Sequence, residues 1–199
     1  MPINFRILTW QDVIKSVREL CNKIVASGFS PDVLIPILRG GAAVALMISD
    51  YLGVKNMLAV RAILYRGINK PGKHLRLLQR ISVGLSGKKV LIIDDVADTG
   101  RTLKAVVEHI KQCGAKEVRV ATLHLKPRSI FTPDFYIEVT NDWIVYPWEY
   151  HEFLREVRES MERGDFSEEE MRRAEEAIKK INKILKESGE SQTFGASSQ

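Results

Sequence analysis

The sequence predicts an α/β fold in which helices cover a mostly parallel sheet. Short apolar runs at residues 33–37, 57–64, 89–93 and 118–125 have the length and composition of buried strands. Amphipathic helical patterns alternate with these runs, and that order is typical of a parallel sheet. The chain has 199 residues, of which 45% are hydrophobic, so it can bury one such domain with an appendage.

The helices of the first half have recognisable ends. Thr9 and Asp12 have the spacing of a capping box, which predicts the start of a helix that stops at Gly28. A second helix is expected over residues 42–52, where Gly53 ends it. Both helices lie next to apolar runs, as strand–helix alternation requires.

Residues 65–80 differ from their surroundings. They contain two glycines, one proline and many cations, with little apolar periodicity, so we predict a long mobile loop. Leu75, Leu77 and Leu78 allow a strand at the far end of this loop.

The second half continues the alternation and then becomes helical. A helix is expected between the strand at 89–93 and Gly114, and short strands near 135–139 and 143–146. The chain from Glu149 onward is charged and helical.

The last predicted helix is an amphipathic appendage. Ser167 and Glu170 form a second capping-box pattern at its start. Its apolar residues make one narrow stripe, formed by Met171, Ala174, Ile178, Ile181 and Leu185. We expect this stripe to pack on the main domain or on a neighbouring subunit, and residues 188–199 to be disordered.

Composition limits the environment and the partners. No apolar run approaches the roughly 20 residues that span a bilayer, and the N-terminus lacks the apolar region of a signal peptide, so we expect a cytoplasmic protein. Cys21 and Cys113 lie on apolar helix stripes and are expected to be buried free thiols. The net charge of +5 suits an anionic ligand, either nucleic acid or a polyphosphate.

The most informative stretch is Val90–Thr102, where an apolar strand ends in the tandem acids Asp94 and Asp95. Ligands of open α/β sheets bind beyond the carboxyl ends of the strands. The segment Asp98–Thr102 opens a helix there, and the free N–H groups of a helix N-terminus bind phosphate. Gly100 allows close approach of the backbone to that phosphate.

The two acids suit a sugar better than a phosphate. Carboxylates repel phosphate but accept hydrogen bonds from vicinal ribose hydroxyls, so the pattern predicts a ribose 5-phosphate site. Tandem acids also occur as Mg²⁺ ligands of nucleotide hydrolases and as phospho-acceptors in receiver domains. A hydrolase would need a Gly-Lys-Ser/Thr loop, which the nearest candidate, residues 84–89, lacks. A receiver would carry its acids near the start of the domain.

The string Val90–Thr102 resembles the phosphoribosyl pyrophosphate (PRPP) motif of the type I phosphoribosyltransferases, and the similarity extends over roughly residues 30–157. Within this family the chain looks closest to the 6-oxopurine enzymes, especially archaeal ones. The resemblance implies a Rossmann-like sheet in a domain over residues 1–160, with a small hood made by the N-terminus and about residues 126–157. Residues 161–187 would be a helical extension.

The resemblance also implies roles for the motif. Asp94 and Asp95 would hold the ribose hydroxyls, Asp94 would also bind Mg²⁺, and Asp98 would be the catalytic carboxylate near purine N7. The remaining residues would bind the ribose phosphate: Val96, Ala97, Thr99, Gly100, Arg101 and Thr102.

A second loop is similar to the pyrophosphate loop of the family. Arg39, Gly40 and Gly41 would bind pyrophosphate, and the bond between Leu38 and Arg39 is the candidate for a cis peptide. Arg155 would be a further pyrophosphate ligand or simply a surface residue. Candidates for a lid over pyrophosphate are Lys70, Lys73, His74 and Arg76.

The purine pocket is expected from three residues. Lys126 would donate to the purine 6-oxo group, Trp143 would stack on the base, and Ile144 would offer backbone groups. Solvent exposure for Lys126 and core packing for Trp143 are the plainer alternatives, and Trp148 is assigned to the core. Glu149 stands where the family usually has an aspartate that binds metal.

The resemblance implies an Mg²⁺-dependent purine phosphoribosyltransferase of purine salvage. It would transfer the phosphoribosyl group of PRPP to hypoxanthine, guanine or xanthine, giving the nucleoside 5′-monophosphate and pyrophosphate. A homodimer or homotetramer is expected. The alternative is a nucleotide-sensing regulator of the same fold that binds nucleic acid, but no helix-turn-helix or aromatic–basic pattern favours a nucleic-acid partner. Enzymes for adenine, orotate or uracil fit Lys126 and Trp143 poorly.

Overall fold

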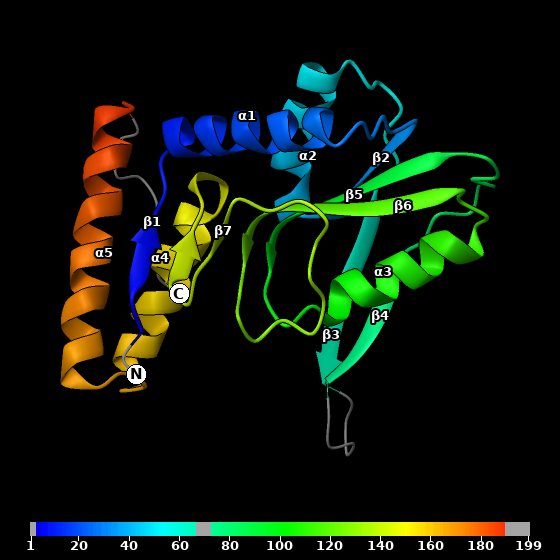
Figure 1. Cartoon of the computed structure of the whole chain (residues 1–199). Coiled ribbons are helices and arrows are strands. Elements are labelled where there is room, and N and C mark those ends of the chain that lie inside the picture. Colours follow the sequence, from blue (N-terminus) through cyan, green and yellow to red (C-terminus); the bar gives the residue numbers. More distant parts are fainter. Residues whose placement is uncertain (1–2, 67–72, 190–199) are drawn as a thin grey trace. The chain divides into compact units, whose positions relative to one another are not determined.

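The computed structural model describes residues 3–66 and 73–189. The chain divides into two compact units, residues 14–140 (the sheet unit) and residues 1–13 with 141–199 (the hood unit). Each is described by itself (Figure 1). The lid candidate Lys70 and the tail beyond residue 189 lie outside the described residues.

The sheet unit is built on a six-stranded sheet with the order β4-β3-β2-β5-β6-β7. Neighbouring strands are parallel except β3 and β4, which are antiparallel. The strands are β2 (Val33–Leu38), β3 (Val60–Arg66), β4 (Lys73–Gln79), β5 (Lys89–Ala97), β6 (Glu117–Leu125) and β7 (Glu138–Val139). This arrangement confirms the predicted α/β class.

Helices cover both faces of this sheet, which explains why its central strands are apolar on both sides. In Figure 1, α2 (Gly40–Leu52) and α3 (Arg101–Gln112) lie on opposite faces. Alternate residues of a strand point to opposite faces, so a strand covered twice needs an uninterrupted apolar run. The first five residues of β2 are all buried, as this rule requires.

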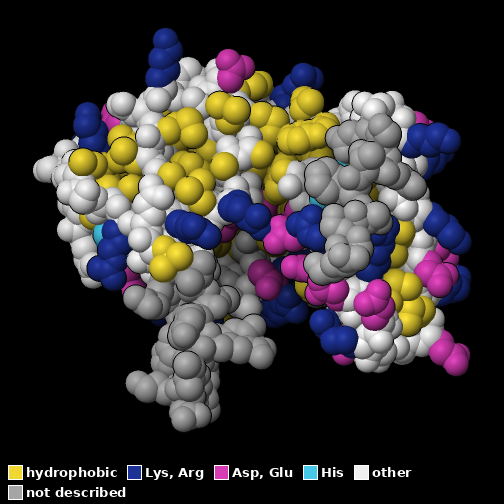
Figure 2. Space-filling model, turned by 180° about the vertical axis from the view of Figure 1, so that it is seen from behind, with side chains coloured by type: hydrophobic (Ala, Val, Ile, Leu, Met, Phe, Trp, Pro, Cys, Tyr) yellow, Lys and Arg dark blue, Asp and Glu magenta, His cyan; other side chains and the backbone are white. Residues whose placement is uncertain are grey.

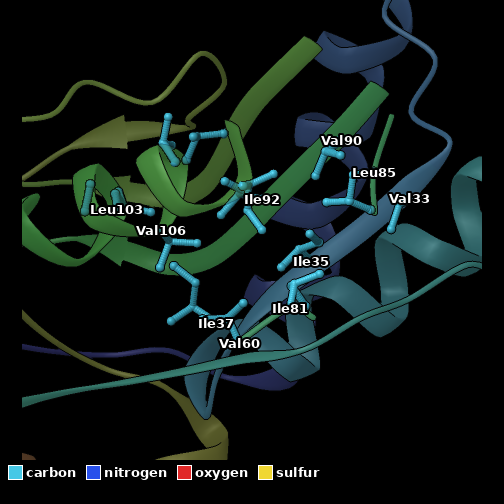
Figure 3. Packing of buried hydrophobic residues seen from close by; sticks show 14 of the residues in the cluster. Val33, Ile35, Ile37, Val60, Ile81, Leu85, Val90, Ile92, Leu103 and Val106 are labelled. Carbon is cyan, nitrogen blue, oxygen red and sulfur yellow. The ribbon is translucent and has the colours of Figure 1, made fainter. Parts of the chain in front are cut away.

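The core on the α3 side joins β2 and β5 to that helix (Figure 3). Its members recur at every second strand position and at helical spacing, and they include Val33, Ile35, Ile37, Val90, Ile92, Leu103 and Val106. These side chains hold the carboxyl end of β5 and the start of α3 in a fixed relation. The turn between them is therefore anchored on both sides.

The strand order reverses between β2 and β5. The chain leaves β2 through α2 and joins β3 on one side, whereas it leaves β5 through α3 and joins β6 on the other side. Because β2 and β5 are parallel neighbours, their carboxyl ends lie together. Open α/β sheets bind their ligands at such a switch point.

The prediction of a loop over residues 65–80 is wrong at both of its described ends, whereas the strand that Leu75, Leu77 and Leu78 allowed at the far end is confirmed. Strand β3 runs to Arg66, and residues 73–79 form β4, which pairs antiparallel with β3 from Lys73 onward. Strand β4 lies at the edge of the sheet, so it is held by backbone hydrogen bonds to a single neighbour. Such an edge strand tolerates charges that mask the apolar alternation on which the prediction relied.

The hood unit contains the two-stranded parallel pair β1 (Phe5–Ile7) and β8 (Trp143–Val145). It also holds the 3-10 turn η1 (Pro147–Glu149) and helices α4 (Tyr150–Glu162) and α5 (Glu168–Glu187). One apolar core joins them, formed by Ile7, Val145, Tyr150, Phe153, Leu154, Val157, Ala174, Ala177 and Ile181. The apolar stripe of α5 thus packs on other elements of this unit, with Ala177 as an addition to the predicted set.

Both predicted capping boxes are present. The Asp12 carboxylate accepts hydrogen bonds from the Thr9 backbone N and hydroxyl at 2.8 and 2.7 Å, and Thr9 Oγ1 accepts one from Asp12 N. These bonds lower the pKa of Asp12, with the Thr9 hydroxyl as the largest cause. Helix α1 (Trp10–Ala26) begins at this box. Ser167 and Glu170 form the same arrangement at the start of α5.

The two thiols are free, but only one is buried as predicted. Cys21 is fully buried, and burial raises its pKa to about 11. Cys113 is half-buried at the end of α3, where its Sγ lies 3.6 Å from the Ile81 carbonyl oxygen. Among the described residues, no helix combines the length and the apolar character that crossing a membrane requires.

Candidate active site

Two helix N-termini lie at the switch point of the sheet. Helix α2 starts after Arg39 and α3 starts after Gly100, and neither N-cap residue makes a side-chain capping bond. The first N–H groups of a helix have no partner within the helix, so both ends attract anions. The peptide bond between Leu38 and Arg39 is cis, as predicted.

The turn between β5 and α3 encloses a cavity of about 190 Å³. Its lining is the predicted phosphate motif, with Asp94 and residues 96–103. Gly100 has φ 73°, and a Cβ there would lie 2.5 Å from Ser129 Oγ and 2.6 Å from Phe131 N. Only glycine fits this position, because a side chain would disfavour the left-handed backbone conformation and would overlap the neighbouring atoms.

The tandem acids lie in the second half of β5, which continues past the predicted end at Ile93 to Ala97. Asp94 Oδ1 accepts a hydrogen bond from Asp95 N at 3.1 Å, and Asp95 Oδ1 accepts one from Val96 N at 2.7 Å. Burial and the neighbouring Asp95 carboxylate raise the pKa of Asp94 well above its ordinary value of 3.8. A cation or hydroxyl donors next to Asp94 would stabilise its charged form and so offset the effects of burial and of the Asp95 charge.

The predicted pyrophosphate loop lies directly against these acids. A Cβ on Gly40 would come within 2.5 Å of Asp95 Cγ and overlap the carboxylate oxygens. A Cβ on Gly41 would overlap the carbonyl oxygen of Ile93, which belongs to the backbone of β5. The start of α2 therefore lies against the acid pair, and the cavity at the start of α3 includes Asp94 in its lining.

Lys126 and Asp98 belong to two segments of the sheet unit that a backbone hydrogen bond joins. The Lys126 side chain is buried, with 8% of the residue exposed, and its backbone N donates to Ala97 O at 2.9 Å. Burial excludes the solvated-lysine alternative. Asp98 Oδ1 accepts a hydrogen bond from Arg128 Nε at 2.8 Å and another from Arg128 Nη2. Arg128 was not among the site residues predicted from the sequence.

The other predicted site residues belong to the hood unit. Trp143 is 51% exposed, which rules out the core-packing alternative, while Ile144 is buried. Glu149 Oε1 accepts a hydrogen bond from Tyr146 N at 3.0 Å, within the capping of η1. Arg155 is exposed on α4.

Trp148, which was assigned to the core, is only partly buried. Its ring stacks on Tyr146 at 4.8 Å between centroids, with the planes inclined by 6°. Its Nε1 is buried without a hydrogen-bond partner among the described residues.

The donor set fits a magnesium ion that arrives with a phosphorylated substrate. The described residues contain no group of three or more His, Cys, Asp or Glu side chains able to hold a metal alone. Mg²⁺ is usually bound by one or two carboxylates together with substrate phosphates and water. Asp94, a half-buried carboxylate next to the carboxylate of Asp95, meets that requirement.

Gly41→Ala tests the contact between the pyrophosphate loop and β5. The added methyl group meets backbone rather than a flexible side chain, so we expect a loss of about 1–3 kcal/mol in the free energy of unfolding. Gly84→Ala is the matched control, because a Cβ there meets nothing within 4 Å. Urea denaturation measures both variants, and equal stabilities would contradict the described contact.

Asp94→Asn tests the electrostatic cost of the Asp94 carboxylate in the folded protein. The folded pKa of Asp94 is above its unfolded value, so its contribution to stability is complete below pH 3.8 and is lost as pH rises through the folded pKa. We therefore expect Asp94→Asn to be more stable than the wild type at pH 8 without ligand, with a smaller difference at pH 4. Urea denaturation without Mg²⁺ or phosphate checks this, and a variant less stable at pH 8 would refute it.

Comparison with known proteins gives the family. The model of the phosphoribosyl transferase domain matches residues 5–152. The xanthine-guanine phosphoribosyltransferase of Chromohalobacter salexigens is 31% identical over 144 residues, which are 71% of this chain and 82% of that protein. A crystal structure of a purine phosphoribosyltransferase from Pyrococcus horikoshii has a TM-score of 0.67 at 36% identity, covering 73% of this chain and 94% of that one.

The human hypoxanthine-guanine phosphoribosyltransferase is 38% identical over 78 residues. That match spans 36% of the human protein, about a third of its length. The domain match covers the switch point, both glycine-bearing loops and the hood strands. The chain belongs to the phosphoribosyl transferase domain family.

Proposed function

We propose that this protein transfers the phosphoribosyl group of PRPP to a 6-oxopurine. The observation that carries the proposal is the order of groups at the switch point, where two helix N-termini without side-chain caps lie next to an acid pair. PRPP has the same order, because its ribose hydroxyls lie between a 5′-phosphate and a pyrophosphate. A ligand with one phosphate would leave one helix N-terminus unused.

The 5′-phosphate would bind at the start of α3, where Thr99, Gly100, Arg101 and Thr102 line the cavity. The pyrophosphate would bind at the start of α2, with Arg155 as a further proposed ligand. Asp94 and Asp95 would accept hydrogen bonds from the ribose hydroxyls. Mg²⁺, held by Asp94 and the substrate and by Glu149 as a proposed second ligand, would neutralise the leaving pyrophosphate.

The purine would be selected by hydrogen bonding at its 6-oxo group. Lys126 is a buried donor, and a donor at this position suits an oxo group better than the amino group of adenine. The exposed ring of Trp143 is free to stack on a base, and Ile144 would contribute backbone groups. The names of the relatives agree with a 6-oxopurine but leave hypoxanthine, guanine and xanthine open.

The transfer breaks the bond between ribose C1′ and the pyrophosphate oxygen and forms a bond from C1′ to the purine nitrogen. Asp98 would take or hold the purine proton at N7 as positive charge develops on the sugar. The loop amides at the starts of α2 and α3 would hold the two phosphorylated ends still while C1′ moves between them. The products are a nucleoside 5′-monophosphate and pyrophosphate.

We also propose a cytoplasmic homo-oligomer. Figure 2 shows hydrophobic side chains gathered on one face of the molecule. Helix α2, which carries the pyrophosphate loop, leaves Leu46 and Tyr51 exposed. These side chains support an interface between copies of the chain. A homodimer or a homotetramer would bury them.

Asp98→Asn, assayed beside the wild type, tests the proposed activity. With PRPP, Mg²⁺ and each purine and pyrimidine base in turn, the wild type should form a nucleoside monophosphate from at least one 6-oxopurine. The variant loses the proton acceptor, so its kcat should fall by about 100-fold or more while PRPP binding changes little. A wild type inactive with every base would refute the function, and equal turnover in the variant would refute the role of Asp98.

Lys126→Ala separates recognition of the base from recognition of PRPP. Loss of the donor should lower kcat/KM for the preferred 6-oxopurine by about 10-fold or more, with the PRPP KM nearly unchanged. Initial-rate kinetics with each substrate varied in turn measure both effects. Purine kinetics that match those of the wild type would show that Lys126 does not contact the base.

A further inference from the structure

Arg128 is the charged partner of the proposed catalytic carboxylate. Its Nε and Nη2 both donate to one oxygen of Asp98, Oδ1. The other oxygen, Oδ2, accepts no hydrogen bond from the residues that the structure describes. One face of the carboxylate is thus anchored, and the other is available to a ligand in the cavity that Asp98 lines.

The backbone around Arg128 is itself fixed. Ser129 N donates to Lys126 O at 2.9 Å, which closes a turn with Pro127 and Arg128 at its centre. Proline presets the backbone for the second position of such a turn. The turn is tied to the phosphate loop by Lys126 N on Ala97 O at 2.9 Å and by Ile130 N on Thr99 O at 3.0 Å. Arg128 is therefore held beside Asp98 by bonds on both sides.

Two residues of this turn are linked to the groups proposed to contact one edge of the base. Purine O6 and N7 lie side by side on the same edge. Lys126, the proposed donor to O6, begins the turn, and Arg128 anchors Asp98, the proposed partner of N7. A single turn thus links both groups that would read this edge.

From this arrangement we infer that Arg128 is a positioning residue for the transfer reaction. It fixes Asp98 through Oδ1 so that Oδ2 meets the purine proton while Lys126 meets the 6-oxo oxygen. This inference rests on the proposed function and deepens it. Arg128 and Asp98 are 65% and 47% exposed in their side chains, so the pair contributes little to folding stability. The pair instead fixes the position of the Asp98 carboxylate.

The test is a kinetic cycle with the full-length chain. Wild type, Arg128→Ala, Arg128→Lys, Asp98→Asn and the double variant Asp98→Asn/Arg128→Ala are assayed with PRPP and the preferred purine. Arg163→Ala is the matched control, because Arg163 Nε donates to Asp165 Oδ2 at 2.9 Å in a pair of similar exposure, 60% and 51%, in the hood unit. Urea denaturation of each variant accompanies the kinetics.

We expect Arg128→Ala to lower kcat by about 10- to 100-fold, as misplacement of a catalytic group does, with the PRPP KM within about 2-fold of the wild type. Arg128→Lys should recover part of the loss, and Arg163→Ala should behave as the wild type. In the Asp98→Asn background, removal of Arg128 should cost less than about 2-fold, because residues that act through one group are not additive.

Three outcomes would overturn the inference. The first is an unchanged kcat in Arg128→Ala, and the second is an equal loss in both backgrounds, which would mean that Arg128 acts independently of Asp98. The third is a PRPP KM that rises as kcat falls, which would assign Arg128 to phosphate binding. A wild type inactive with every base would instead refute the proposed function and this inference together, so the two failures are distinguishable.

Discussion

The close approach of the Gly40–Gly41 backbone to the end of β5 is the constraint on which the rest of the site depends. No side chain fits between these segments, because a Cβ on Gly41 would overlap the carbonyl oxygen of Ile93. The approach places the start of α2 beside the tandem acids, while the chain itself places the start of α3 after them. The two proposed phosphate sites and the proposed ribose site thereby belong to neighbouring segments at the switch point of the sheet.

This arrangement carries an electrostatic cost. Desolvation of the half-buried Asp94 and the neighbouring Asp95 carboxylate raise the pKa of Asp94 and disfavour its charged form. Neither helix N-terminus has a side-chain cap to satisfy its free N–H groups. A ligand that brings phosphates, hydroxyl groups and Mg²⁺ would satisfy all of these groups together. These acids and helix ends are the groups proposed to bind substrate.

Much of the sheet unit could be predicted from the sequence, because the patterns that indicate its strands and its phosphate motif are local in the chain. Buried strands such as Val33–Leu38 are continuous apolar runs, and the acids and glycine of residues 94–102 are contiguous along the chain. The full length of β4 was not predicted, because an edge strand can carry charges without losing its backbone bonds. Cys113 lies on an apolar stripe but near the helix end, where burial is incomplete.

Arg128 could not be predicted because its partner is 30 residues away and the turn that carries it has no motif of its own. The exposure of Trp143 likewise depends on tertiary packing rather than on its neighbours in sequence. The sequence held only a weak signal for this role, namely that Arg128 follows Lys126 and Pro127 at the end of a predicted strand. Long-range ion pairs of this kind emerge only when the folded backbone brings two loops together.

Isothermal titration calorimetry with Mg²⁺ tests the central claim most directly, by comparing PRPP, ribose 5-phosphate and pyrophosphate on the wild-type chain. If both helix N-termini and the acid pair bind one molecule, PRPP should bind at one site per chain and more tightly than either fragment, by about 10-fold or more. Each fragment should compete with PRPP. PRPP that binds no more tightly than ribose 5-phosphate would contradict the claim that the start of α2 holds the pyrophosphate.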